Sequence, residues 1–169
     1  DEDRLDKLAI DFVNHYKKRQ TEKSSYDGKA MFVSSSREIA YKFYKRIVKL
    51  EPEWTKVLQS SPGEELSRQE KIKIKPSEKI KLVMTRDKDD EKDLYDLLGT
   101  KEYRKELDRQ FKQVKSNFKI AIVVDMWITG FDVKFLETIY IDKPIEKHNL
   151  IQTISRVNGK YKNKENGLI

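Results

Sequence analysis

Three short segments of the chain carry side chains that could contact phosphate groups: Ser34–Ser36, Asp125–Asp132, and a stretch that contains Gln152 and Arg156. The first segment precedes an expected helix. Serine hydroxyls and the free backbone N–H groups of a helix N-terminus attract phosphate oxygens, and the helix dipole adds to this attraction. The same serines could instead be ordinary helix caps, so this loop predicts a phosphate site only in combination with the other two segments.

The second segment places two carboxylates and a Thr-Gly pair directly after the most apolar run of the chain. Gly130 can let the backbone approach a ligand closely or adopt a positive φ angle. Asp132 could accept a hydrogen bond from a ribose hydroxyl or hold an arginine in place. A tight turn between two strands would also favour Gly and Asp, so both interpretations stay open.

The third segment carries Gln152 and Arg156, which are four positions apart. On a helix this spacing puts both side chains on the same face. An arginine near the ligand edge of a sheet suits a phosphate clamp, because its planar guanidinium offers several donors in a fixed geometry. A charged side chain on a solvated helix face is the alternative.

Strand and helix patterns alternate along the chain and must position these segments. Short apolar runs predict strands at 29–33, 80–84, 118–124, 137–141 and from 167 onward. Helical spacing of apolar residues predicts helices over 4–18, 37–49, 90–98, 101–114 and 148–157, with a break at Gly99. This alternation predicts an α/β fold whose mostly parallel sheet has helices on both faces. The loops that leave the carboxyl ends of parallel strands form the ligand edge, so the three segments are expected to meet there.

The composition excludes several classes of protein. Charged residues make up 38% of the 169 residues and hydrophobic residues 37%, which indicates a highly solvated chain that still has clear strand runs. The absence of cysteine excludes disulfide scaffolds and thiolate metal sites, and no metal site is expected in this chain. The longest apolar run, Ile120–Val124, is too short to span a bilayer, and we expect a cytoplasmic protein with no membrane partner. The net charge of +7 is compatible with a polyanionic partner.

We expect one domain at 29–169, preceded by an N-terminal helix and linker at 1–28. Residues 51–78 hold three of the four prolines and many charges, which predicts an irregular insertion. Gly167–Ile169 reads as the opening of a truncated strand. The chain is therefore expected to be a piece of a larger protein.

At these segments the sequence resembles a known family. The strings VVDMWITGFDV at 123–133, TIYIDKPIEKHNLIQTISRVN at 138–158 and GKAMFVSSSREIA at 28–40 are similar to the restriction (R) subunits of type I restriction enzymes. The MT-x-x-x-DD pattern at 84–90 and the stretch LLGTKEYRKELDRQF at 97–111 resemble the same family. In order and placement the three loops match motifs IV, V and VI of superfamily 2 helicases.

The resemblance implies a RecA-like, P-loop-NTPase-type domain that is the second motor domain of an ATP-driven translocase of double-stranded DNA. It assigns Gly130 and Asp132 to motif V, and Gln152 and Arg156 to motif VI, all four as nucleotide contacts with Arg156 as the catalytic arginine. Ser34, Ser35 and Ser36 correspond to the motif IV loop at the DNA backbone, and Thr129 is a weaker candidate for contact with DNA or with the other motor domain. ATP and Mg²⁺ would be held mainly by the first motor domain of the same protein, and the modification and specificity subunits would be further partners.

The sequence departs from the family pattern in two respects. No G-x-x-x-x-G-K-[ST] string is present, so the chain lacks a P-loop and is expected to be inactive by itself. The second motif VI arginine would fall at position 159, which is Gly159. Another superfamily 2 helicase, or a non-catalytic RecA-like module that binds nucleic acid or a partner protein, are the alternative interpretations.

Overall fold

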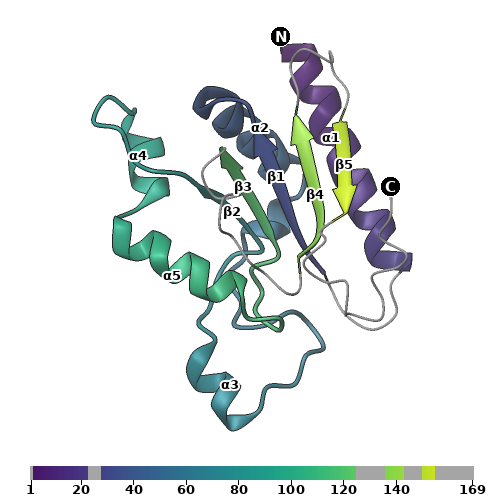
Figure 1. Ribbon diagram of the computed structural model, residues 1–169, viewed down its shortest axis with the longest axis vertical. Coiled ribbons are helices and arrows are strands. Elements are labelled where there is room, and N and C mark those ends of the chain that lie inside the picture. The colour runs from purple at the N-terminus through teal and green to yellow at the C-terminus, as the bar shows by residue number, and fades with distance from the viewer. Residues whose placement is uncertain (1, 23–27, 125–135, 143–149, 155–169) are drawn as a thin grey trace.

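The computed structural model describes residues 2–22, 28–124, 136–142 and 150–154; at 136–137 and 150–154 it describes the backbone alone. The sheet has five strands in the order β2-β3-β1-β4-β5 (Figure 1). The first four are mutually parallel, and β5 runs antiparallel to β4 at one edge. The predicted mostly parallel α/β sheet is confirmed. The strand bounds are β1 Lys29–Ser34, β2 Ile80–Val83, β3 Ile120–Val124, β4 Leu136–Asp142 and β5 Leu150–Ile154.

Strands β1 and β3 lie side by side inside the sheet, between β2 and β4. Every residue of β1 is buried, and Ile120 to Val123 in β3 have no exposed surface. A strand covered on both faces needs a continuous apolar run, because neither set of alternating side chains meets water. The apolar run of β3 therefore lies in the interior, as its composition predicts.

One face of the sheet is covered by α1 (Glu2–Glu22) and α2 (Arg37–Leu50). The ring of Phe12 from α1 has no exposed surface and lies in edge-to-face contact with three rings of the core. These rings come from β1, α2 and β4, and belong to Phe32, Phe43 and Tyr140. The N-terminal helix is thus part of the same hydrophobic core as the sheet, although it precedes the first strand.

The opposite face is covered by α5 (Lys101–Phe111), whose Leu107 and Phe111 are buried against Met31 and Val123. The predicted helices on both faces are confirmed. A shorter helix, α4 (Lys92–Leu98), precedes α5, and Gly99 separates the two with φ +72°. A Cβ atom on Gly99 would lie 2.4 Å from Cδ2 of Tyr103, so this turn requires glycine both for its backbone angle and for space.

The irregular region between α2 and β2 contains a 3-10 helix, Pro52–Thr55, and α3, Arg68–Lys73. Its ends approach one another through an isolated bridge between Leu58 and Ser77. The side chain of Gln110 in α5 donates to the carbonyl of Lys73 and accepts from the backbone N–H of Lys75. Few of the residues of this region reach the core, but it is held against α5 by hydrogen bonds.

Two lysines are buried at the amino end of the sheet. Lys29 Nζ donates to Ser116 Oγ at 2.9 Å and to the carbonyl of Phe118. Lys119 Nζ donates to the carbonyl of Val114 at 2.7 Å. Burial, and then repulsion by Lys119, lowers the pKa of Lys29 well below its ordinary value. Both side chains thus donate hydrogen bonds to backbone carbonyls of the segment that links α5 to β3.

The prediction of a helix over His148–Val157 is wrong, because 150–154 form the strand β5. The β-branched residues Ile151, Thr153 and Ile154 favour an extended chain. Pairing with β4 also satisfies backbone groups that would otherwise stand at an open edge. Gln152 lies opposite Tyr140 in this ladder, so Gln152 stands on a strand and not on the predicted helix. Gly167–Ile169, the expected last strand, lies outside the described residues.

Candidate functional site

The parallel register brings the carboxyl ends of three strands to one edge of the sheet. Ser34 at the end of β1 pairs with Val124 at the end of β3, and Val83 at the end of β2 pairs with Val123. The serine loop, the chain that follows Val124 and the chain that follows Val83 therefore begin side by side, with β3 in the middle. This edge is the candidate functional site.

The three serines after β1 have different surroundings. Ser34 is buried, and its hydroxyl donates to the carbonyl of Ser36 at 3.2 Å. Ser36 is the N-cap of α2, and its hydroxyl accepts from the backbone N–H of Ile39 at 3.2 Å. Ser35 is exposed to solvent. The capping interpretation therefore describes Ser36, and among the three serines Ser35 is best placed to meet a phosphate group.

Directly after the serine loop, Arg37 forms a two-pronged ion pair with Asp90. The Nη1–Oδ1 distance is 2.7 Å and the Nη2–Oδ2 distance is 2.9 Å. Arg37 also donates to the carbonyl of Thr85 at 2.7 Å. The hydrogen bonds from Arg37 lower the pKa of the Asp90 carboxyl, whose side chain is only 5% exposed. This pair fastens the loop after β1 to the loop after β2.

A second ion pair of the same kind joins α1 to the end of β4. Arg4 donates to both carboxylate oxygens of Asp142, at 2.9 and 3.0 Å. The side chain of Asp142 is fully buried, and its hydrogen bonds raise the pKa of Arg4. Because Arg4 and Arg37 are both held by carboxylates, neither guanidinium is available as a phosphate clamp.

Neither ion pair was expected from the sequence, although signals for one were present. Asp90 ends the MT-x-x-x-DD pattern, and Arg37 is the first residue after the serine loop. Both residues lie in loops that leave strands, β1 and β2, at one sheet edge. Arg4 and Asp142 had no such signal, because their approach depends on how α1 packs across β4.

Four of the predicted site residues, Thr129, Gly130, Asp132 and Arg156, lie outside the described residues, and their roles stay predictions. Gln152 is placed on β5 by its backbone. Ser34, Ser35 and Ser36 are brought to the carboxyl edge as expected.

The described part of this edge does not by itself fit a nucleotide. Arg37 and Arg4 are paired with Asp90 and Asp142, Arg86 donates to the carbonyl of Tyr95, and the hydroxyl of Ser36 caps α2. Within the ranges that the structure covers, no group of three or more His, Asp or Glu side chains could hold a metal ion. None of the helices described is both long enough and apolar enough to cross a membrane.

Comparison with known proteins identifies relatives along the whole chain. The chain is 39% identical over 168 residues to the type I restriction enzyme HindI endonuclease subunit of Haemophilus influenzae, which covers 98% of this chain and 14% of that protein. It is 38% identical over 169 residues to the putative type I restriction enzyme MjaIXP endonuclease subunit of Methanocaldococcus jannaschii, with 99% and 14% covered. No solved structure matches the chain significantly.

The chain thus spans about one seventh of the length of these relatives. The model of the family described as type I restriction enzyme subunit R domain 3 matches residues 26–169, which include every strand of the sheet. The expected resemblance to type I R subunits is confirmed. This chain belongs to the family of type I restriction enzyme subunit R, domain 3.

Proposed function

We propose that the full-length protein is the ATP-dependent, DNA-translocating restriction subunit of a type I restriction-modification enzyme, with this chain as its second RecA-like motor domain. One observation carries the proposal: Ser34 pairs with Val124 in the sheet register. The loops that resemble motifs IV and V therefore start at neighbouring strand ends. A motor domain needs this proximity in order to couple contacts to DNA with contacts to nucleotide.

In this proposal Ser35 meets the DNA backbone, with Thr129 as a further contact. Gly130, Asp132, Gln152 and Arg156 face ATP, and Arg156 stabilises the transferring phosphoryl group. ATP and Mg²⁺ are held mainly by the first motor domain of the same protein. The full-length protein works in the cytoplasm with double-stranded DNA and with the modification and specificity subunits.

The test uses the full-length protein assembled with its modification and specificity subunits. We expect ATP hydrolysis that is stimulated by duplex DNA, and displacement of a third strand from a triplex downstream of the recognition site. The chain of 169 residues alone should hydrolyse no ATP above background, because it has no P-loop. Duplex-independent turnover, or a triplex that stays intact while ATP is consumed, would contradict the proposal.

A second candidate is a non-catalytic RecA-like module that binds nucleic acid or a partner protein. The observation in its favour is Gly159, which stands where the family pattern has a second arginine. A full-length protein that binds duplex DNA, but whose ATP turnover does not respond to Arg156→Ala, would favour this candidate.

A further inference from the structure

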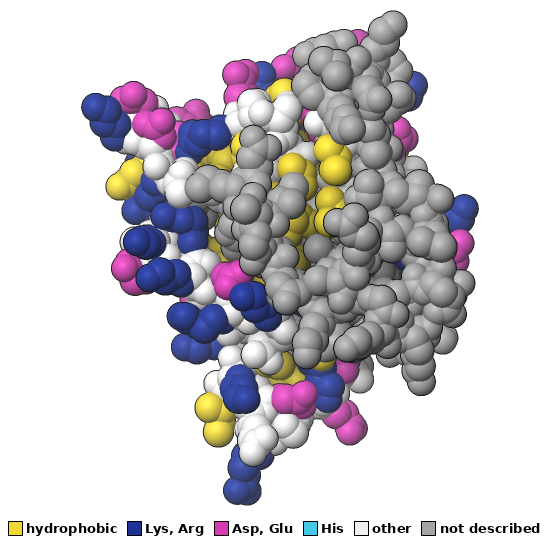
Figure 2. Space-filling view, viewed as in Figure 1, with side chains coloured by type: hydrophobic (Ala, Val, Ile, Leu, Met, Phe, Trp, Pro, Cys, Tyr) yellow, Lys and Arg dark blue, Asp and Glu magenta, His cyan; other side chains and the backbone are white. Residues whose placement is uncertain are grey.

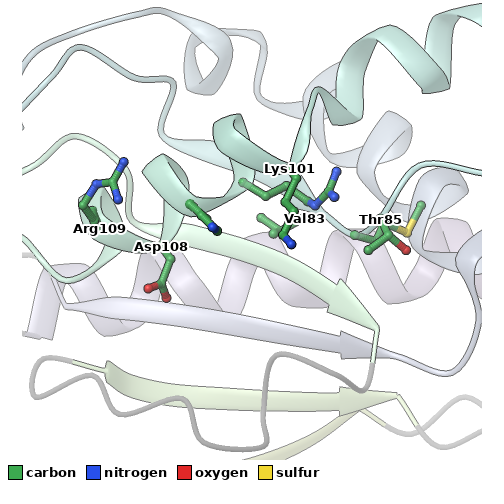
Figure 3. Close-up of a pocket in the computed structure, with 8 residues that line it drawn as sticks. Val83, Thr85, Lys101, Asp108 and Arg109 are labelled. Carbon is green, nitrogen blue, oxygen red and sulfur yellow. The ribbon is translucent and has the colours of Figure 1, made fainter.

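A groove of about 510 Å³ lies between α5 and the carboxyl end of β2. Its floor is apolar and is made by Val83 and Met84, both buried. Its wall is the exposed side of α5. Figure 3 shows Lys101 and Arg109 coming from the two ends of this helix, with Val83 and Thr85 at the end of β2. Neither the strand-end loops nor the family resemblance assigns any role to this groove.

Charge is segregated on α5 so that its cations face the groove. The helix has four basic residues, Lys101, Arg104, Lys105 and Arg109, and all of them line the groove. Of its three acidic residues, only Asp108 lines it. Asp108 is already paired with Lys112 at 3.1 Å. Figure 2 shows Lys and Arg side chains gathered on the side of the molecule where α5 lies.

The four basic side chains of α5 differ in whether they already form an ion pair or a hydrogen bond. Arg109 is paired with Glu106 at 2.7 Å, and Arg104 donates to the carbonyl of Gly99 at 3.1 Å. Lys101 and Lys105 are exposed, and no carboxylate of the described ranges lies within ion-pair distance of either. Within the described part of the chain, these two ammonium groups are available to an anion.

The spacing of these residues suits a polyanion better than a single anion. Lys101, Lys105 and Arg109 are four positions apart, so they follow one face of the helix over about 12 Å. A single small anion cannot reach all of them. Successive phosphates of a nucleic-acid strand can, since a duplex carries about one phosphate per 3.4 Å of axis on each strand.

We propose that this groove binds the phosphodiester backbone of duplex DNA without regard to sequence. The inference rests on the proposed function and extends its DNA path beyond the three motif loops. Val83 pairs with Val123, so the groove opens at the same sheet edge as the serine loop. The exposed cations of the α5 wall can neutralise phosphates along the DNA backbone.

The experiment measures the salt dependence of duplex binding by the full-length protein, with two unrelated duplexes of equal length. The test variant is Lys101→Gln with Lys105→Gln. Each lost phosphate contact should reduce the slope of log affinity against log salt by about 0.9, so the pair should reduce it by about 1.8. Affinity at about 0.1 M salt should fall roughly eightfold for each contact. The loss should be equal for both duplexes.

The matched control is Lys71→Gln with Lys73→Gln on α3, which removes the same charge from two exposed lysines at the far end of the insertion (Figure 1). The control should keep the wild-type slope, and both variants should melt at the wild-type temperature. An unchanged slope in the test variant, or an equal loss in the control, overturns the proposal. So does normal DNA binding combined with failure to assemble with the modification and specificity subunits, which would identify the groove as a protein interface. If duplex DNA fails to stimulate ATP hydrolysis in the wild type, the proposed function fails, whereas the binding slope still tests the groove.

Discussion

Arg37 holds Asp90 through both terminal nitrogens of its guanidinium, across 53 positions of sequence. Arg37 begins α2 directly after the serine loop, and Asp90 closes the loop after β2. Asp90 also accepts from the backbone N–H of Asp87 at 2.8 Å. The Arg37–Asp90 pair therefore fixes the position of the exposed Ser35 relative to the α5 groove, although neither residue of the pair lines that groove.

We expect Asp90→Asn and Arg37→Gln each to lower the free energy of unfolding by about 1–3 kcal/mol, since each leaves a charged partner without its hydrogen bonds. A double-mutant cycle measured by denaturant unfolding should give a coupling near 1 kcal/mol or more. The exposed Lys92–Asp96 pair is the control and should couple by about 0.5 kcal/mol or less. Equal coupling for the two pairs would show that the Arg37–Asp90 geometry adds nothing.

The same pair predicts a response to acid. Because the pKa of Asp90 is lowered in the folded chain, its contribution is complete above the unfolded pKa of about 3.9. It is lost as the pH falls through the lowered value. The free energies of unfolding of wild type and Asp90→Asn should therefore converge as the pH falls below about 4. Curves that stay equally far apart at every pH would contradict the ion pair.

The buried Lys29 predicts a change of the same sign, a free energy of unfolding that rises with pH, but in the alkaline range. Its pKa is lowered, so the folded chain releases this proton more readily than the unfolded chain, whose lysines titrate near about 10.4. The free energy of unfolding should therefore rise with pH between the lowered value and about 10.4. Wild type should gain stability relative to Lys29→Met between about pH 7 and about pH 10.

The control for this trend is Lys7→Met, a change at an exposed position of α1. Thermal melting of the three proteins across this pH range is the measurement. Lys29→Met and wild type would have parallel profiles if Lys29 were charged and hydrated in the folded chain, which would refute the burial.

Phe12 predicts how far α1 belongs to the domain. Phe12→Ala should cost about 3–5 kcal/mol in unfolding free energy, because the side chain is fully buried among three rings. Ile10→Ala on the same helix should cost less than about 1 kcal/mol, since Ile10 is 46% exposed. Denaturant unfolding compares the two. Similar small losses for both would mean that α1 does not contribute to the core of the domain.

The catalytic proposal predicts a contrast between two cations in the full-length motor. Arg156→Ala should reduce ATP turnover about a thousandfold or more, if Arg156 stabilises the transferring phosphoryl group. Lys160 follows Gly159, the position at which the family pattern has a second arginine. Lys160→Ala should cost about tenfold, or about 1.4 kcal/mol of barrier, because an ammonium is a poorer match to phosphate than a guanidinium. Steady-state ATPase with saturating duplex is the measurement. Near-normal turnover in Arg156→Ala would remove that residue from the reaction.

The strands and helices that the sequence predicts correctly are those with one dominant local signal. Val33 and Val123 lie in apolar runs that suit a strand covered on both faces, and Phe12 lies at helical spacing from its apolar neighbours. The segment around Gln152 has no such single signal. Its spacing is compatible with a helix, and its β-branched residues favour a strand; the free edge of β4 decides for the strand.

The parts that could not be predicted depend on tertiary approach. The sequence places Arg37 and Asp90 at the same sheet edge but does not show that they pair, and it gives no sign of the pairing of Arg4. The burial of Lys29 is equally hidden, because a lysine at the start of a strand is usually exposed. Its burial follows from the way the chain between α5 and β3 folds over the end of β1.

The central place of β1 has a consequence for synthesis on the ribosome. Ala30 pairs with Ile120 on one side, and Met31 pairs with Ile139 on the other. The first strand to be synthesised therefore pairs with strands that are synthesised much later. Until most of the chain has left the exit tunnel, the apolar residues of β1 and the rings of α1 and α2 have no sheet to pack against. Such late, non-local pairing slows folding and exposes nascent chains to aggregation. We therefore expect this domain to fold after translation of β4 and to depend on chaperones that shield its N-terminal third.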